Sequence, residues 1–368
     1  MENNRILIND EKCLNCARCI STCHNQGLLA QGSTLADLES YDYTVCMVPP
    51  ALSSYCNTKE QLYDLYNAIR KLGFDEVYDL SPVYGQIMEE TVRVADEFSD
   101  CSVIASFCPL INRLIEAKYP MLLDNLAPLN YPHEAAAKAI RKRLKDKGNV
   151  GIFNCCECEA KLAIAKYPYG NMKCETDHAL AIVDIFPEIK KNQGFGHMKI
   201  DLCREGLQAS NPAMIRQKDE YLIADGFDKI TNILDMAEFD MLSDFHLLYL
   251  FPCFNGCSGG HLLFGNSYLS RNNIFPLTDG SQTMPTKLDF EMIYSDKMAI
   301  TSEEKLTFQE KMELFRKVNA QLERLPGYDC SACGMQTCRI MAEEIVKGNK
   351  KISDCHIIAA AKEKAYEN

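Results

Sequence analysis

The sequence predicts an α/β protein with parallel sheets, and two observations carry this prediction. Between residues 43 and 253, short apolar strands alternate with amphipathic helices, the succession that builds a parallel sheet covered by helices. Several of these strands end at a cysteine, and ligands of open α/β sheets bind beyond the carboxyl ends of the strands. With 368 residues, 47% hydrophobic and 24% charged, the chain forms either two domains or one large domain with appendages.

The first round of alternation covers residues 43–110. Apolar runs rich in β-branched residues predict the strands, and apolar positions at helical spacing predict the helices. The expected elements are, in order, a strand at 43–52, a helix at 58–74, a strand at 75–81, a helix at 85–99 and a strand at 101–110.

A second round follows. It begins with a basic helix at 133–148 and continues with a strand at 149–156, a helix at 225–239 and a strand at 245–253. The basic helix is interpreted as a solvated face, because the whole chain carries a net charge of -12. That charge also argues against a general binder of nucleic acid or of anionic membranes.

The cysteine count points to metal binding in a reducing compartment. Nineteen cysteines cannot all pair, and a chain of this length does not need disulfides to stabilise its core. We expect a cytoplasmic protein, because Met1 is followed by polar residues rather than by a signal peptide. The longest apolar run, at 245–253, is far below the roughly 20 residues of a membrane span.

The first cysteine group has the spacing of bacterial ferredoxin ligands. Its C-x2-C-x2-C-x3-C pattern predicts a [4Fe-4S] cluster, whereas zinc sites pair two C-x2-C units across a longer loop. The group consists of Cys13, Cys16, Cys19 and Cys23. Either Cys23 provides the fourth ligand or a distant thiol such as Cys46 does.

The last cysteine group has a different pattern, C-x2-C-x4-C-x16-C. Pro326, Gly327 and Gly334 indicate a loop, and residues 337–348 have helical periodicity with Gly348 as the C-cap. The fourth ligand therefore returns after one helix. The group consists of Cys330, Cys333, Cys338 and Cys355. It resembles the small four-cysteine domain that binds one [4Fe-4S] cluster in redox-driven ion pumps and corrinoid proteins; a zinc ribbon is the alternative.

In three separated segments of the middle region, the expected strand ends at one or more cysteines. They are Cys108 before Pro109, the run Cys155 to Cys158, and the pair Cys253 and Cys257 in a glycine-rich turn. We expect these segments to meet at one pocket, and the glycines to let the backbone approach an inorganic cluster. For Cys101, Cys174 and Cys203, the simpler interpretation is a small buried apolar residue.

Read together, these segments resemble iron-only ([FeFe]) hydrogenases. The signature stretches are "ASFCPLINRLIEAKYPMLLDNLAPLNYP", "CCECEAKL" and "FPCFNGCSGG", in the order of that family, and the likeness extends from about Tyr43 to Asn273. The "NGCSGGHLLFGNSYLSRNN" stretch and the last cysteine group are similar to the branch proposed to be sensory hydrogenases.

The resemblance implies a cofactor and its ligands. In that family an H-cluster, a [4Fe-4S] cubane linked to a two-iron subcluster with CO and cyanide, is held by four cysteines. The matching residues here are Cys108, Cys158, Cys253 and Cys257. Cys257 would bridge to the diiron unit, and Lys161 would donate a hydrogen bond to a cyanide.

The resemblance also implies a domain plan. A two-lobed H-cluster domain would occupy residues 43–300, with lobes of about 43–148 and 149–300. A ferredoxin-like segment at 1–42 would precede it, and a connector helix with a small helical four-cysteine domain at 301–368 would follow.

The departures from the family fall where protons move. Catalytic members of the family pass protons to the diiron site through a relay of side chains. Phe107 stands where that relay has a cysteine, and Tyr131 and Arg93 stand where it has a serine and a glutamate. Glu90, a further acidic residue nearby, remains. A general acid must reach its acceptor, so rapid proton delivery is not expected.

Further departures surround the lysine. The usual methionine and proline are Cys156 and Glu157, and Ile164 and Phe251 replace a glutamate and a methionine. Cys156 is either a substitute proton carrier, a neighbour of the cluster or core filling.

Two functions follow. The first is a slow, ferredoxin-type hydrogenase or a hydrogen or redox sensor, with electrons relayed through two flanking [4Fe-4S] clusters. The second is a non-catalytic electron-transfer or interaction subunit that never receives the diiron unit. A zinc-only structural protein ranks third. The expected partners are a ferredoxin or another redox protein, or a signalling or hydrogenase subunit, with no nucleic acid.

Overall fold

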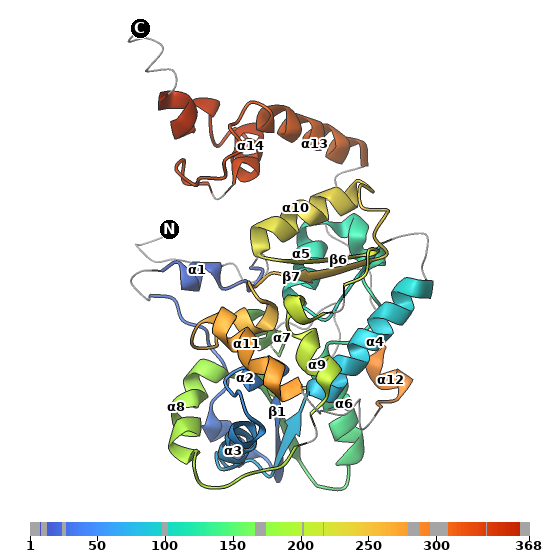
Figure 1. Cartoon of the computed structure of the whole chain (residues 1–368), viewed down its shortest axis with the longest axis vertical. Coiled ribbons are helices and arrows are strands. Elements are labelled where there is room, and N and C mark those ends of the chain that lie inside the picture. The colour runs from blue at the N-terminus through green and yellow to red at the C-terminus, as the bar shows by residue number, and fades with distance from the viewer. Residues whose placement is uncertain are drawn as a thin grey trace. The chain divides into compact units, whose positions relative to one another are not determined.

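The structure is a computed structural model of the whole chain (Figure 1). It describes residues 8, 13–23, 27–97, 102–165, 174–200, 202–215, 217–278, 287–294, 308–335 and 337–360. Two compact units make up the chain, Met1–Ile300 and Thr301–Asn368. Each unit is treated separately below.

The first sheet of the larger unit has four parallel strands in the order β2-β1-β4-β5. Their bounds are Tyr43–Val48 for β1, Glu76–Asp79 for β2, Val150–Cys156 for β4 and His178–Ala181 for β5. β1 lies between β2 and β4, with Val45 opposite both Glu76 and Ile152. The strand expected at 43–52 ends early, because the chain turns at Pro49 into a short helix.

The second sheet has three parallel strands in the order β3-β7-β6. Their bounds are Val103–Ile104 for β3, Tyr221–Asp225 for β6 and Leu247–Phe251 for β7. β3 is much shorter than the strand expected at 101–110, and residue 101 lies outside the described residues. The two sheets interleave along the chain, so both halves of residues 43–300 contribute strands to each sheet.

Helices fill the connections between these parallel strands, as crossover connections require. Pro109 and Pro132 begin two of them, at the first helical position where a missing N–H costs nothing. The helices are α1 Arg18–Ser21, α2 Pro50–Ser53, α3 Lys59–Arg70, α4 Ser81–Glu97, α5 Pro109–Lys118, α6 Pro132–Arg143, α7 Glu159–Ile164, α8 Ile182–Asn192, α9 Arg204–Ala209, α10 Phe227–Glu238, α11 Ser267–Thr278 and α12 Phe290–Ile293.

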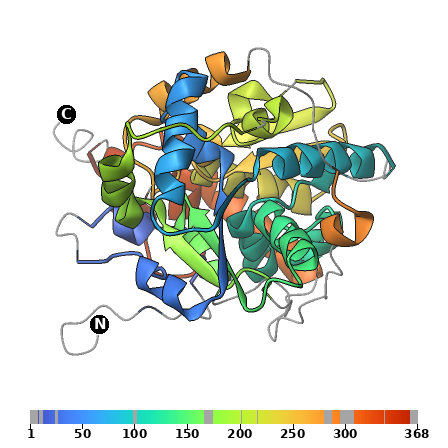
Figure 2. The same ribbon diagram turned by 90° about the horizontal axis from the view of Figure 1, so that it is seen from below.

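The first sheet is covered on both faces. Val45 and Met47 of β1 pack in the same core cluster as residues of α4 and α6, whereas Cys46 and Val48 pack with residues of α3 and α8. This alternation is the period of two of a strand buried on both sides. Figure 2 shows helices around the strands of this sheet.

One core cluster joins the two sheets. It contains Val45 and Ile152 of the first sheet together with Val103, Tyr249 and Phe251 of the second. The other face of the second sheet packs against α5 and α10 in a separate cluster. At roughly 1.5 to 3 kcal/mol for each large buried side chain, the shared cluster is a major source of cohesion between the sheets.

The packing of α4 on α9 depends on a glycine. A Cβ at Gly206 of α9 would lie 1.6 Å from the carbonyl oxygen of Ser81, the first residue of α4. Only glycine allows the two backbones to come this close.

The smaller unit is helical. It contains α13 (Phe308–Leu322), α14 (Cys338–Val346) and a 3-10 turn, η6, at Ile352–Asp354. The connector helix expected at 301–325 is present from Phe308, and residues 301–307 lie outside the described residues. The C-cap of α14 is Lys347, one residue before the expected Gly348; Gly348 has a φ of 81°, the left-handed conformation common just after a C-cap.

The parallel sheets and covering helices confirm the predicted α/β class. No helix among the described residues combines the length and the apolar character needed to cross a bilayer.

Candidate functional site

The four cysteines of the middle segments all follow parallel strands. Cys108 follows β3 and precedes the first residue of α5, and Cys158 follows β4 and precedes α7. Cys253 follows β7, and Cys257 lies in the 3-10 turn η5, Gly256–Gly259. Both sheets thus contribute cysteines from the carboxyl ends of their strands, where ligands of α/β proteins bind.

These four thiols lie close enough to influence one another. Burial raises the pKa of Cys253 to about 12, and the thiol of Cys108 contributes to the shift. Burial also raises the pKa values of Cys158 and Cys257 well above the usual range, with further contributions from charges at neighbouring groups, Cys108 and Cys253 among them. Thiolates at such a site need a compensating positive charge, which iron supplies.

Lys161 lies in the same place, on α7. It is 4% exposed, and its ammonium donates hydrogen bonds to the carboxylate of Glu157 and to the hydroxyl of Tyr84. Burial lowers the pKa of Lys161, but the carboxylate of Glu157, followed by Tyr84 and the nearby thiols, outweighs burial and raises it well above the usual value. Lys161 is therefore a charged side chain inside the protein.

Glu157 is completely buried. One carboxylate oxygen pairs with Lys161, and the other has no hydrogen-bond partner among the residues that the structure describes. Its backbone carbonyl accepts from the N–H of Leu262 at 3.0 Å. Glu157 and Tyr84 were not expected as partners of the lysine, although an acidic residue four positions before a lysine in "CECEAKL" was a readable signal.

Other buried polar atoms near the quartet also lack a hydrogen-bond partner in the described part of the chain. They are the hydroxyl oxygen of Ser258, next to Cys257, and both ring nitrogens of His133. Burial, followed by the charge of Lys161, lowers the pKa of His133 to about 3, so its ring is neutral. Buried polar atoms are normally hydrogen-bonded, so partners supplied by a bound group fit this region.

The glycines of η5 are needed for contacts within the chain. Gly256 has a φ of 66°, and a Cβ there would lie 2.4 Å from the carbonyl oxygen of Ser210. A Cβ at Gly259 would lie 1.9 Å from the carbonyl oxygen of Phe254. These glycines therefore let the turn that carries Cys257 fold tightly against backbone.

Phe107 is part of an aromatic group. Its ring lies 5.1 Å from that of Phe251 and 6.0 Å from that of Tyr249, between ring centroids, and its side chain is 6% exposed. Two of the departures noted in the sequence, Phe107 and Phe251, are therefore in contact. The aromatic group occupies the core that joins the two sheets.

The residues at the other positions of the family's proton relay make contacts with neighbouring side chains. The Arg93 guanidinium pairs with Glu90 at 2.8 Å, and the Tyr294 hydroxyl also donates to Glu90, at 3.0 Å. Tyr131 accepts from the side-chain amide of Asn112 at 3.1 Å and stacks on His133. Glu90 is thus retained as a residue but engaged near the surface.

Cys156 is placed differently from the quartet. It is completely buried in a small apolar cluster with Leu162 and Leu262, and its sulfur contacts the side-chain nitrogen and the carbonyl oxygen of Asn154 at 3.4 Å. Burial raises its pKa well above the usual value. A proton-carrying role for Cys156 stays a prediction.

The first cysteine group forms a loop around α1. Asn15 and Ala17 have φ values of 53° and 56°, and the N–H of Asn15 donates to the sulfur of Cys13 at 3.4 Å. Arg18 anchors this loop to α10 through an ion pair with Asp228 at 3.0 Å. Besides burial, Cys16 is also among the charged groups that raise the pKa of Cys253.

Cys46 lies in another environment. It is completely buried in β1, and its sulfur is 3.4 Å from that of Cys155 in the adjacent strand β4. Of the other cysteines outside the three groups, Cys203 is completely buried and Cys174 donates to Glu134 at 3.2 Å. Cys101 lies outside the described residues.

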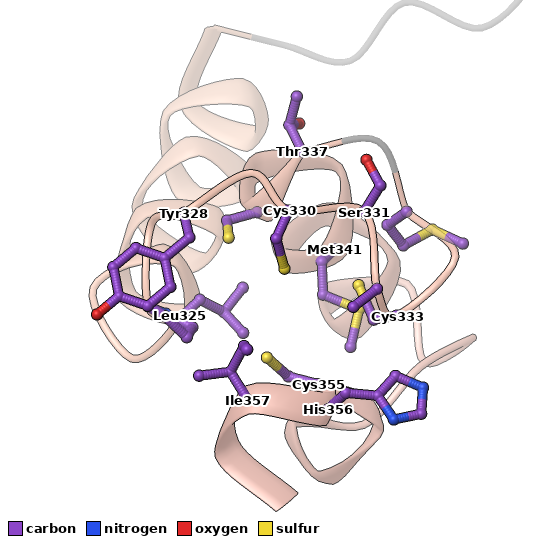
Figure 3. Close-up of a pocket in the computed structure, with 14 residues that line it drawn as sticks. Leu325, Tyr328, Cys330, Ser331, Cys333, Thr337, Met341, Cys355, His356 and Ile357 are labelled. Atoms are coloured by element: carbon purple, nitrogen blue, oxygen red, sulfur yellow. The ribbon is translucent and has the colours of Figure 1, made fainter. Parts of the chain in front are cut away.

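The last cysteine group lines one hollow in the smaller unit. Its space, including the part open to solvent, is about 340 Å³, and Cys330, Cys333, Cys338 and Cys355 all line it. Figure 3 shows the side chains of Cys330, Cys333 and Cys355 directed toward this space. The side chain of Thr337 caps α14 by accepting from the N–H of Ile340 at 3.1 Å, which fixes the helix that begins at Cys338.

Within the described part of the chain, no three Cys, His, Asp or Glu side chains come close enough to hold a single metal ion. The thiolates of a cubane bind separate irons, and so they need not converge on one atom.

Two regions of the chain match known protein families. Residues 42–193, which contain Cys108, Cys158 and Lys161, match the family described as "Iron only hydrogenase large subunit, C-terminal domain". Residues 325–357, which contain the last cysteine group, match the family described as "Putative Fe-S cluster". No curated protein matches the chain.

Solved structures of [FeFe]-hydrogenases share the fold. One is a variant of HydA1 from Chlamydomonas reinhardtii, 13% identical, with a TM-score of 0.50 over 73% of this chain and 96% of that chain. A second, from a study of H-cluster assembly in HydA(deltaEFG), is 14% identical, with a TM-score of 0.51 over 72% and 98%. A third, from a study of oxygen inactivation of the H cluster, is 13% identical, with a TM-score of 0.53 over the same shares.

Proposed function

We propose that this chain, a hydrogenase large-subunit-like iron-sulfur protein, reacts slowly with hydrogen at a central H-cluster-type site and serves as a hydrogen or redox sensor. The observation that carries the proposal is the central quartet. Four cysteines follow strands of both sheets, and each interacts electrostatically with a buried, charged lysine. The position matches the sites where the fold class binds its ligands.

The residues of this chain would have distinct tasks. Cys108, Cys158, Cys253 and Cys257 would hold a [4Fe-4S] cubane, with Cys257 shared with a diiron unit. When bound, the H-cluster supplies the two-electron chemistry of hydrogen. The unpartnered atoms of Ser258 and His133 would donate or accept hydrogen bonds at the edge of the bound group.

Slow turnover follows from the surroundings of the site. Phe107 provides no titratable group, and its contacts with Phe251 and Tyr249 fill the space with aromatic rings. Glu90 is held by Arg93. A general acid contributes roughly 10²- to 10⁴-fold to a reaction, so its loss suits a sensor, which needs binding more than rate.

Electrons would leave through the flanking groups. Cys16 of the first cysteine loop interacts electrostatically with Cys253, which supports a [4Fe-4S] cluster there as the next carrier. Cys23 is favoured as its fourth ligand, because Cys46 is buried against Cys155 in the sheet. A ferredoxin, another redox protein or a signalling subunit would accept the electrons.

The test is iron analysis combined with infrared spectroscopy. Protein matured with the diiron cofactor is expected to contain three [4Fe-4S] clusters and to show CO and cyanide bands that shift under hydrogen. Absence of these bands in protein with intact cubanes would exclude an H-cluster function.

One observation favours the second candidate, an electron-transfer subunit without the diiron unit. Lys161, the residue implied to bind a cyanide, already pairs with Glu157. Hydrogen uptake by the purified protein above that of a Cys257→Ala variant would exclude this candidate.

A further inference from the structure

Glu157 acts electrostatically on the central site, because, in addition to burial, its charge contributes to raising the pKa values of Cys158, Cys253 and Cys257. It directly precedes Cys158, the N-cap residue of α7, and its carboxylate pairs with the ammonium of Lys161, a residue of α7. The side chains of the pair are 1% and 3% exposed, respectively. A buried ion pair of this kind is held firmly, because separating it leaves an unpaired charge inside the protein.

The ion pair removes the positive charge that Lys161 would otherwise present. The groups around Lys161 are Glu157, the hydroxyl of Tyr84 and the nearby thiols, whereas His133 is neutral. An anionic ligand near Lys161 would compete with Glu157 for the same ammonium and would be repelled by its second, unpartnered oxygen. At the short distances inside a protein, such like-charge repulsion is strong.

We propose that Glu157 is a specificity-determining residue that compensates the charge of Lys161 and weakens the affinity of the central site for anionic ligands of a bound cluster. The proposal deepens the proposed function and rests on it. The ligand class concerned is the cyanide type, small anions bound to iron.

The chain offers a matched control at Glu159. This residue begins α7 two positions later, and burial raises the pKa of its carboxyl group. One of its carboxylate oxygens is also buried without a partner, but no ion pair joins it to Lys161. Substitution of Glu159 therefore reports on the loss of a nearby acidic group that does not hold the lysine.

The test uses the full chain with its cubanes in place, as verified by iron content and electron paramagnetic resonance. A synthetic, anionic diiron complex with CO and cyanide ligands is added at increasing concentration, excess complex is removed, and the retained CO bands are measured per protein. Wild type is compared with Glu157→Gln, Glu157→Ala, Glu159→Gln, Lys161→Met and the Glu157→Gln/Lys161→Met double variant.

The expected result is that both Glu157 variants retain the complex at least about tenfold more tightly than wild type, because Lys161 becomes available to cyanide. Glu159→Gln is expected to retain the complex as weakly as wild type. The Glu157→Gln/Lys161→Met double variant is expected to lose the increase in retention seen with Glu157→Gln. Equal retention by wild type and the Glu157 variants, or an undiminished gain in the double variant, would overturn the proposal.

The same experiment distinguishes the role of Glu157 from the H-cluster function. Retention by Glu157→Gln and none by wild type would support the role of Glu157 and favour the electron-transfer candidate. Retention that is equal in all variants would refute the role of Glu157 and leave the H-cluster function standing. No retention by any variant with intact cubanes would refute both.

Discussion

At the scale of residues, Phe107 shows how one substitution is embedded in its neighbours. The ring replaces the thiol that the hydrogenase resemblance implies, and it contacts Phe251, which is itself a departure. The sequence shows both departures, but their contact depends on the placement of β7 beside β3. Pairings between distant strands cannot be read from local patterns.

Replacement of Phe107 by cysteine is expected to raise the hydrogen production of diiron-loaded protein by about 100-fold, because a general acid contributes roughly 10²- to 10⁴-fold. The same change should lower the free energy of unfolding by about 2 to 4 kcal/mol, since the aromatic contacts are lost. Rate assays and thermal unfolding measure the two effects. Phe251→Met is the control, because it disturbs the same aromatic group without adding an acid; equal rates in the two variants would contradict the prediction.

His133 predicts a dependence of stability on pH. Its pKa is about 3 in the folded chain and 6.5 when exposed, so below pH 6.5 the unfolded state binds a proton that the folded state does not. Stability contributed by the neutral ring is therefore lost as the pH falls from 6.5 toward 3.

His133→Gln removes this titration. Between pH 6.5 and pH 5, wild type is expected to lose about 1.5 kcal/mol more unfolding free energy than the variant. Thermal unfolding of both proteins across this range measures the difference, and acid damage to the clusters is common to both. Parallel pH profiles would show that His133 is not responsible.

At the scale of elements, the close packing of α9 on α4 predicts a loss of stability when Gly206 is replaced. Gly206→Ala is expected to lower the free energy of unfolding by about 3 kcal/mol, because the added Cβ would lie 1.6 Å from a backbone carbonyl oxygen that cannot rotate away. Calorimetry measures the effect.

Gly27→Ala provides the control for the same substitution type. A Cβ at Gly27 would meet nothing within 4 Å, so the melting temperature of the Gly27→Ala variant is expected to stay near that of wild type. A Gly206→Ala variant as stable as Gly27→Ala would show that α9 can shift on α4.

The elements differ in how far the sequence predicts them. Long amphipathic helices such as α3 and α4, and apolar strands such as β4 and β7, were expected, as was β1, which ends earlier than the strand expected at 43–52. β5 was not expected, because its sequence HALA contains no β-branched residue, and β6 was not expected either. β3 was overestimated because apolar residues continue past its pairing with β7 into α5.

At the scale of the whole molecule, the cysteine spacing carried most of the functional prediction. Local ligand patterns survive in the sequence because their geometry is set by a few consecutive residues. The ion pair of Lys161 with Glu157 follows a helical spacing and was readable. The contact with Tyr84 was not, since Tyr84 lies on α4, far away in the sequence.

The two compact units predict separate responses to the loss of one ligand. Cys355 is 6% exposed and packs with Val318 and Met341 in the core of the smaller unit. Cys355→Ala is expected to remove about a third of the cluster iron and to lower the melting transition of the smaller unit alone.

Iron content and calorimetry measure these effects, with Cys174→Ala as a control that keeps all of the iron. An unchanged iron content in Cys355→Ala would show that the hollow of the smaller unit does not hold a cluster through this thiol. Loss of iron from the central quartet as well would show that the units depend on each other.

The interleaving of the two sheets also dictates a sequence of events during synthesis. β3, which leads to Cys108, has its pairing partner in β7, and Cys257 lies 149 positions beyond Cys108. At roughly 5 to 20 residues per second, Cys108 is synthesised about 7 to 30 s before the last thiol of its group. Assembly of the central quartet therefore waits for the synthesis of β7 and Cys257, and a complete cluster cannot be delivered to the first half of the site alone.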